Sequence, residues 1–328
     1  MPNALIDAYL DQLVTQRQLS PHTIDGYRRD LAQLSALAAA ASGSDLPLLT
    51  HFQIRKFTAK LHGQGLNPRS IARKLSAWRG FFGWLAAHGE LLASPLASNP
   101  VAGVKAPKRA KTLPKALSAD DAVRLVSHHR SGVDAASLSA SAPDQLCNRA
   151  MFELLYSSGL RVSELVGLDV RHTQQAGYAS LGWLKLDQHE VTVTGKGKKV
   201  RDVPVGQPAL DALRAWLAVR PQLLKAGDDC PNNGAALFVS GRGSRMSARL
   251  VQLRLKAHAQ ALGIPVNVHP HMLRHSFASH VLQSSGDLRA VQEMLGHSSI
   301  ASTQVYTALD FMHLSKVYDA AHPRAGKK

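Results

Sequence analysis

Apolar residues recur at helical spacing through the first hundred residues of the chain. Ser20 and Pro21 form a helix-start signal, because serine is a favoured N-cap and proline fits the first helical position. The segment 22–37 that follows carries apolar side chains three and four positions apart, which predicts one buried helical face. A second start at Asn67 and Pro68 opens a longer helical segment. Its predicted buried stripe is Ile71, Leu75, Trp78, Phe82 and Leu85.

The pattern changes after this helical region. Residues 99–115 hold three prolines and five basic residues without an apolar period, which predicts a semi-extended, positively charged linker. A solvated hinge is one interpretation; between two domains of a basic protein, a linker lying along a phosphate backbone is favoured. The expected division is a helical domain over 1–98, the linker, and a larger domain over 116–328.

The larger domain mixes helical and strand patterns. A helix start lies at Ser118, a helical segment covers 146–156, and the chain after Ala209 is helical with glycine and proline punctuation. Residues 189–205 show two alternating runs around a Gly-Lys-Gly-Lys turn, which is typical of a β-hairpin. Residues 131–143 are rich in serine and alanine and predict a loop. We therefore expect a mainly α-helical protein with a small β-sheet.

Composition narrows the class of partner. Lys plus Arg number 39 against 23 Asp plus Glu, a formal net charge of +16 over 328 residues, and this surplus favours nucleic acid or an acidic membrane face. No stretch approaches the roughly 18 uninterrupted apolar residues of a spanning helix, and no signal-peptide core is present. Cys147 and Cys230 form no CxxC pair, which argues against a disulfide framework or a cysteine-built zinc site. The sequence predicts a cytoplasmic protein.

Two segments of the larger domain each carry a basic residue that could bind an anion. Arg161 follows a glycine-containing turn at a predicted helix N-terminus, where a guanidinium and free backbone N–H groups point the same way. Lys196 lies at the predicted hairpin tip, where glycines allow close approach to a backbone and the amine can act as a proton donor. Taken singly, each is more often a surface residue. No Walker-type GxxxxGK[ST] motif is present.

Three further candidates are histidine and arginine residues near the C-terminus. His271 and Arg274 lie three apart on one face of a predicted helix, so both could reach one phosphate. His271 and His275 have the spacing of a helical metal pair, but the segment lacks the Glu of HExxH, so a metal is not expected. His297 follows a predicted helix end, where a lone histidine is usually structural or solvent-facing.

Tyr306 completes a combination that is more specific than its parts. Two arginines, one lysine, two histidines and a tyrosine, without an acidic cluster for Mg²⁺, suit metal-free phosphodiester chemistry. Tyrosine has an unperturbed pKa of about 10, so as a nucleophile it needs nearby cations and a base. Two arginines supply bidentate donors for the charge on phosphorus, and a lysine can protonate the departing 5′ oxygen. No cofactor is expected.

These residues resemble, in order and spacing, the signature of the tyrosine recombinase (phage integrase) family, Xer type. The resemblance covers nearly the whole chain, and residues 314–325 (LSKVYDAAHPRA) are similar to the XerC branch, which resolves chromosome dimers. The family often has a histidine two positions after its nucleophile, where this chain has Ala308. Loops 131–143 and 174–183 look longer than usual in Xer proteins. The signature residues are Arg161 in GLRVSEL, Lys196 in TGKGKK, His271 and Arg274 in HMLRHSFASH, His297 in LGH, and Tyr306 in STQVYT.

The resemblance implies a four-helix, SAM-like core-binding domain over 1–98 and a mixed α/β catalytic domain that close around DNA as a clamp. It also implies cleavage and rejoining without metal or ATP. The implied roles are Tyr306 as the nucleophile that forms a 3′-phosphotyrosine, Arg161 and Arg274 as holders of the non-bridging oxygens, Lys196 as the acid for the leaving oxygen, His271 as acid and base at the tyrosine, and His297 as a hydrogen-bond donor to the phosphate.

The implied assembly is a tetramer on two paired sites of double-stranded DNA, passing through a Holliday junction at a dif-like site. A XerD-like recombinase and a septal DNA translocase are the implied partners, and residues 311–325 would dock on a neighbouring protomer. Three alternatives remain. A type IB topoisomerase shares the chemistry but needs no two defined sites, and a phage or integron integrase differs in its target. A non-enzymatic DNA-binding protein explains the charge but not the six residues.

Overall fold

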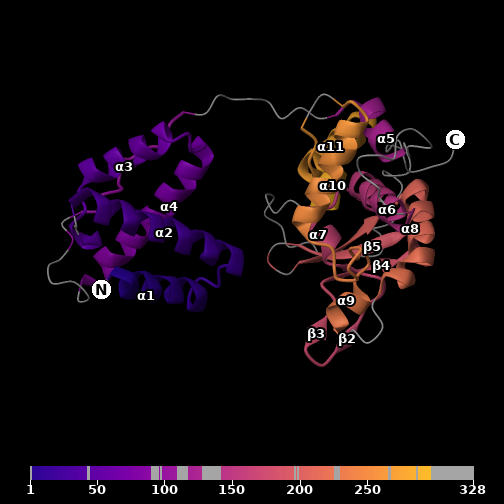
Figure 1. Ribbon diagram of the computed structural model, residues 1–328, viewed down its shortest axis with the longest axis horizontal. Helices are drawn as coiled ribbons and strands as arrows, with labels where there is room; N and C mark the ends of the chain where they lie inside the picture. Colours follow the sequence, from indigo (N-terminus) through magenta and orange to yellow (C-terminus); the bar gives the residue numbers. More distant parts are fainter. Residues whose placement is uncertain are drawn as a thin grey trace. The chain divides into compact units, whose positions relative to one another are not determined.

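The computed structural model describes residues 2–42, 45–89, 96, 98–108, 117–127, 142–195, 197, 199–224, 230–264, 267–285 and 287–296. The chain divides into two compact units, Met1–Leu113 and Pro114–Lys328 (Figure 1). Each unit has a hydrophobic core of its own. Among the described residues, no helix is long and apolar enough to cross a membrane.

The N-terminal unit is helical, as its apolar spacing predicts. Its described elements are α1 (Pro2–Thr15), α2 (Pro21–Ser42), a 3₁₀ turn (Leu46–Leu48), α3 (His51–Gly63) and α4 (Pro68–Ala87). The predicted start of α4 is confirmed, because the Asn67 side chain accepts a hydrogen bond from the Arg69 backbone N–H at 2.9 Å. The predicted stripe of α4 is buried against α1 and α2.

The first residues of the predicted linker pack on this unit. Val101 and Val104 are buried in the N-terminal core. The Arg79 guanidinium donates to the Val104 carbonyl at 3.0 Å and to the Val101 carbonyl at 3.5 Å. The part of 99–115 nearest α4 is therefore held on the N-terminal unit by buried apolar side chains. The proline-rich composition of the segment did not predict this burial. Residues 109–116 lie outside the described part of the chain.

The C-terminal unit surrounds a small sheet with helices (Figure 1). Strand order is β1-β4-β5-β6, with β1 parallel to β4 and the other pairs antiparallel. The strands are β1 (Leu168–Asp169), β4 (Gly182–Lys185), β5 (Glu190–Thr194) and β6 (Val200–Pro204), and the described helices are α5 (Ala119–Ser127), α6 (Ala142–Ser158), α7 (Val162–Val166), α8 (Gln207–Val219), α9 (Pro231–Ala235), α10 (Ala248–Ala261), α11 (Pro270–Ser285) and α12 (Leu288–Leu295). The predicted hairpin is confirmed as β5 and β6, and the mainly α class with a small sheet is correct.

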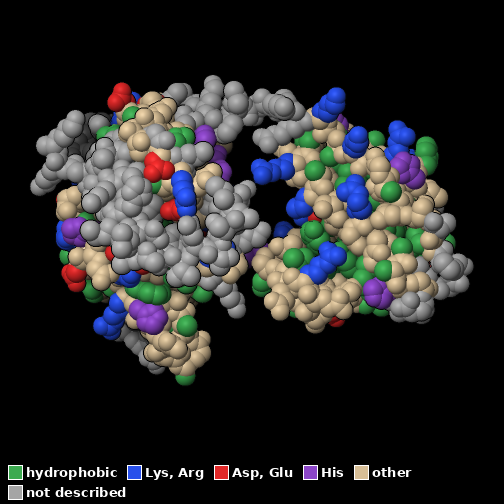
Figure 2. Space-filling view, turned by 180° about the vertical axis from the view of Figure 1, so that it is seen from behind, with side chains coloured by type: hydrophobic (Ala, Val, Ile, Leu, Met, Phe, Trp, Pro, Cys, Tyr) green, Lys and Arg blue, Asp and Glu red, His purple; other side chains and the backbone are tan. Residues whose placement is uncertain are grey.

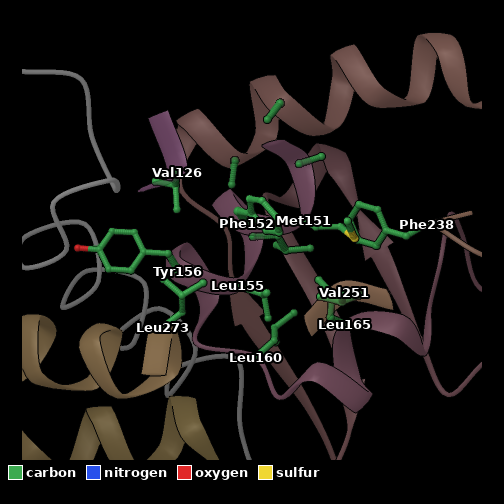
Figure 3. Packing of buried hydrophobic residues seen from close by; sticks show 14 of the residues in the cluster. Val126, Met151, Phe152, Leu155, Tyr156, Leu160, Leu165, Phe238, Val251 and Leu273 are labelled. Atoms are coloured by element: carbon green, nitrogen blue, oxygen red, sulfur yellow. The ribbon is translucent and has the colours of Figure 1, made fainter. Parts of the chain in front are cut away.

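Helix α6 runs through the core of this unit. Its apolar side chains, including Met151, Phe152 and Leu155, point into a cluster that also receives Phe238 and Leu273 from distant parts of the chain (Figure 3). These five side chains are at most 1% exposed. The β-branched and aromatic strand residues and the helix stripes thus share one core, which fixes α11 relative to the sheet.

A buried hydrogen-bond chain also fastens α11 to α6. His280 Nε2 lies 3.1 Å from the Leu117 carbonyl, which can only accept, so this nitrogen carries the proton. His280 Nδ1 then accepts from the Tyr156 hydroxyl at 2.9 Å. Burial lowers the pKa of His280, which favours this neutral ring. The helix that carries His271 and Arg274 is therefore held in a fixed orientation.

The longer loop at 174–183 forms a second hairpin, β2 (Gln174–Gln175) with β3 (Tyr178–Ala179). The Tyr178 hydroxyl lies 2.8 and 2.9 Å from the two carboxylate oxygens of Asp169, and Arg245 reaches the same carboxylate at 2.5 Å. Burial first, and then the hydrogen bond to Asp169, raise the pKa of Tyr178 to about 12, so the hydroxyl keeps its proton. Residues 131–141 of the other long loop lie outside the described part.

Candidate active site

Arg161 enters the site from a turn that only glycine allows. Gly159 adopts a left-handed conformation (φ +57°), and the Phe277 ring lies where its side chain would be. The chain then continues extended at Arg161 and begins α7. The Arg161 side chain is 37% exposed, and its Nη1 lies 2.8 Å from Glu164 Oε1. This guanidinium is held at its protein side and open to solvent on the other.

Glu164 is the centre of the charged network. Its side chain is 3% exposed, and it accepts two parallel hydrogen bonds of 3.0 Å from Arg201. It also accepts from the Arg161 backbone N–H at 2.8 Å. Burial by itself would raise the pKa of Glu164, but the hydrogen bonds and charge of Arg201, and then those of Arg161, hold it below the ordinary value. Glu164 is therefore ionised at neutral pH.

Arg274 is buried on α11 within the same network. Its Nη1 donates to the Gly159 carbonyl at 2.6 Å and lies 3.8 Å from Glu164 Oε2, while Nη2 donates to the Leu295 carbonyl at 2.5 Å. Burial first, and then the charge of Arg161, lower the pKa of Arg274 to about 10, so it stays charged at neutral pH.

The charges of this network do not balance. Arg161, Arg201 and Arg274 supply three guanidinium groups against the single carboxylate of Glu164, a surplus of two positive charges. Such a surplus in a poorly solvated place is costly unless an anion completes it. Planar guanidinium groups hold phosphate oxygens in defined directions. The network is therefore suited to hold a phosphodiester.

His271 lies one helical turn before Arg274 and is exposed. Partial burial first, and then the charges of His269 and Arg274, lower the pKa of His271. A neutral imidazole can take a proton, as a base beside a nucleophile must. Within the described ranges, no group of three or more His, Cys, Asp or Glu side chains could hold a metal ion.

The structure thus brings together three of the six predicted site residues. Arg161 and Arg274 meet at Glu164, and His271 lies on the same helix as Arg274. The other three, Lys196, His297 and Tyr306, lie outside the described residues and stay predictions.

Two residues of the network were not singled out from the sequence. Glu164 lies within the motif GLRVSEL, three positions after Arg161, where it can reach back to the preceding turn. In β6, the buried residues Arg201 and Val203 alternate with the less buried Val200 and Asp202. A charged residue on the apolar side of a strand requires a partner, and this was the available signal.

Residues 115–313 match the Phage integrase family, and residues 6–89 match its N-terminal SAM-like domain. The chain belongs to the phage integrase family. This recombinase is 56% identical, over its whole length and 95% of the relative, to "Tyrosine recombinase XerC 1" of Ralstonia nicotianae. It is 47% identical to "Tyrosine recombinase XerC" of Pseudomonas aeruginosa, over 98% of this chain and 96% of that one.

Solved structures share the fold of this recombinase. The XerH site-specific recombinase bound to palindromic difH substrate matches with a TM-score of 0.64 and 21% identity, over 92% of this chain and 81% of that one. A lambda integrase(75-356) dimer bound to a COC′ core site matches with a TM-score of 0.62 and 18% identity, over 93% and 98%. The protein is a tyrosine recombinase of the XerC type, which cleaves and rejoins DNA. Its relatives favour this activity over a non-enzymatic DNA-binding role or a type IB topoisomerase.

Proposed function

We propose that this recombinase resolves chromosome dimers at a dif-like site through a 3′-phosphotyrosine intermediate and a Holliday junction. The observation that carries the proposed chemistry is that Arg161 and Arg274 both lie beside the buried carboxylate of Glu164, with a surplus of positive charge. Two guanidinium groups fixed relative to each other are what an in-line displacement at phosphorus requires.

In the proposed cleavage step, the Tyr306 oxygen attacks the scissile phosphorus while His271 takes the phenolic proton. A new O–P bond forms to tyrosine, and the bond from phosphorus to the 5′ oxygen breaks. The electron pair goes to the 5′ oxygen, and Lys196 supplies its proton. Arg161 and Arg274 hold the non-bridging oxygens, and His297 donates a hydrogen bond to the phosphate. Reversal of these transfers rejoins the strand without ATP.

In the proposed function, the N-terminal unit binds the DNA duplex. Its described part exposes more basic than acidic side chains, and Figure 2 shows several of them on the visible face. Such a surface binds the phosphate backbone without regard to sequence. Residues 1–98 and the linker 99–115 would contact DNA, and 116–328 would hold the catalytic chemistry. The exposed basic residues are Arg17, Arg28, Arg29, Arg55, Lys56, Lys60, Arg69, Arg73, Arg79, Lys105 and Lys108.

The proposed assembly is a tetramer on two paired sites in the cytoplasm. It includes a XerD-like recombinase as second subunit, and a septal DNA translocase regulates it. The support is by relationship: the matched lambda integrase tetramer is bound to a Holliday junction, with a TM-score of 0.63 and 18% identity to this chain. Residues 311–325 would dock on the neighbouring protomer and couple the two activities.

Covalent trapping on a nicked suicide duplex tests the proposed nucleophile. The duplex carries a dif-like site, and the reaction contains EDTA. We expect the wild type and Tyr178→Phe, which removes a different tyrosine of the same unit, to give a DNA-shifted band in a denaturing gel. Tyr306→Phe should give none. An adduct that survives in Tyr306→Phe, or that EDTA abolishes, would contradict the proposed step.

A further inference from the structure

The Arg201 side chain makes hydrogen bonds to two separate segments of the C-terminal unit. It lies on β6 and is 9% exposed. Nη1 and Nη2 donate to the two carboxylate oxygens of Glu164 in α7 at 3.0 Å, and Nε donates to the Met294 carbonyl near the end of α12 at 3.1 Å. A planar guanidinium can make these bonds together because its donors point in fixed directions, which an ammonium group cannot reproduce.

Two glycines leave the space that this guanidinium fills. A β-carbon on Gly195 would lie 3.2 Å from Arg201 Nη1, and one on Gly296 would lie 3.1 Å from both Cζ and Nη1. Gly195 closes the β5–β6 hairpin by donating to the Lys199 carbonyl at 2.7 Å. Gly296 ends α12 in a left-handed conformation (φ +62°). The guanidinium therefore packs directly on the backbone of two turns.

Each of these turns leads into a residue of the proposed machinery. Gly195 precedes Lys196, and Gly296 precedes His297. The third contact, Glu164, is also the residue that holds Arg161. The Arg201 guanidinium therefore connects Glu164 with the two turns that precede Lys196 and His297.

We propose that Arg201 is a positioning residue for strand cleavage, which fixes the backbone leading into Lys196 and into His297 against Glu164. The inference rests on the proposed function, because it takes Lys196 as the acid for the leaving oxygen. Arg201 itself does not touch DNA in this scheme. Its loss should act on the protonation of the 5′ oxygen through Lys196.

The test compares two suicide duplexes, one ordinary and one with sulfur in place of the bridging 5′ oxygen. A thiolate leaves without a proton donor, so sulfur restores cleavage when only the acid is lost. We expect Arg201→Lys to cleave the ordinary duplex about 100-fold more slowly than the wild type, in single turnover at saturating protein. On the sulfur duplex the deficit should fall to about tenfold or less, the remainder reflecting the His297 turn.

A milder variant keeps the test decisive if Arg201→Lys does not fold. Gly195→Ala leaves the ion pair in place but forces the guanidinium to shift by a few tenths of an ångström. It should show the same preference for the sulfur duplex. Gly241→Ala is the matched control, because a β-carbon there meets nothing within 4 Å. Wild-type cleavage of the ordinary duplex by both Arg201→Lys and Gly195→Ala, or equal deficits on both duplexes, would overturn the inference.

Two further variants, together with the wild type, separate this inference from the proposed function. The wild type must form the adduct and Tyr306→Phe must not, which reports on the nucleophile alone. Lys196→Ala must be rescued by sulfur, which reports on the acid alone. If both hold and sulfur fails to rescue Arg201→Lys, the positioning role is wrong while the proposed function stands.

Discussion

Each unit of this recombinase buries a carboxylate among basic side chains, and the two sites differ in what they connect. In the N-terminal unit, Asp30 is 1% exposed, accepts from Lys74 at 2.8 Å and pairs with Arg73. Its backbone carbonyl accepts from the Trp78 indole at 2.8 Å. In the C-terminal unit, Glu164 accepts from Arg161 and Arg201.

The partners of Asp30 all belong to α4, so its network joins two regular helices, α2 and α4. The partners of Glu164 come from a turn, a strand and a helix, and they also donate to the backbone carbonyls of Gly159, Met294 and Leu295. The residue types of a buried ion pair therefore do not indicate its role. The role depends on whether the pair connects regular helices, as Asp30 does, or segments next to turns, as Glu164 does.

The largest expected effect is that of Glu164→Gln. The amide cannot balance Arg201 and Arg274, so the guanidinium groups move apart and the turns they hold shift. We expect single-turnover cleavage to fall on the order of 100-fold, because a shift of about 1 Å costs that much in a positioned site. The free energy of unfolding should fall by about 3 kcal/mol, as when one partner of a buried ion pair is removed.

A trapping assay and urea unfolding measure both quantities for this variant. Glu190→Gln is the matched control, because Glu190 is another buried carboxylate of the same unit and pairs with Lys185 at 3.4 Å. It should leave the cleavage rate within about threefold of the wild type. If both variants cleave equally slowly, loss of any buried carboxylate damages the unit and the contrast between the two sites disappears.

The next effect, that of Asp30→Asn, should lie on stability and not on chemistry. Removing the carboxylate leaves Lys74 buried beside a neutral group, which should cost about 2–3 kcal/mol of unfolding free energy. Once bound to DNA at a temperature where it is folded, the variant should cleave at the wild-type rate. Asp25→Asn, on the exposed side of the same helix, should change neither quantity. If DNA-bound Asp30→Asn cleaved more slowly than the bound wild type, the contact between α2 and α4 would also affect the cleavage step.

Sequence reasoning found the parts of this fold whose signals are local. The start of α4 follows from Asn67 and Pro68, and the β5–β6 hairpin follows from alternation around the turn at 195–198. It missed β1 and β4, because strands of two and four residues are too short to show a clear alternation of apolar and polar positions. It also assigned Val101 and Val104 to a linker, because their burial depends on a surface formed by other helices.

The candidate site shows the same division. Arg161, His271 and Arg274 were predicted from motif context and a family resemblance, and in the structure both arginines lie beside Glu164. Lys74 is not among the residues predicted to form the buried stripe of α4, yet it is only 8% exposed, because it pairs with Asp30, 44 positions earlier in the chain. Arg201 is also explained only by partners far away in the sequence. Charges that are buried through tertiary contacts leave little local pattern.

The smallest effect is a difference in pH dependence between two carboxylates of the C-terminal unit. The pKa of Glu164 is held below its ordinary value, so its ionised form stabilises the fold above pH 4.5 and this contribution is lost as the pH falls through the folded-state pKa. The pKa of Glu190 is raised, first by burial and then by the charge of Asp202, against the opposing charge of Lys185. Its ionised form therefore opposes folding, and acid relieves that cost.

Urea unfolding between about pH 3.5 and 7 measures both contributions. The free energy of unfolding of the wild type should exceed that of Glu164→Gln by less as the pH falls. Relative to Glu190→Gln, the free energy of unfolding of the wild type should instead rise as the pH falls. Parallel curves for the two comparisons would mean that Arg201 does not hold Glu164 ionised, and Glu164 would then not differ electrostatically from Glu190.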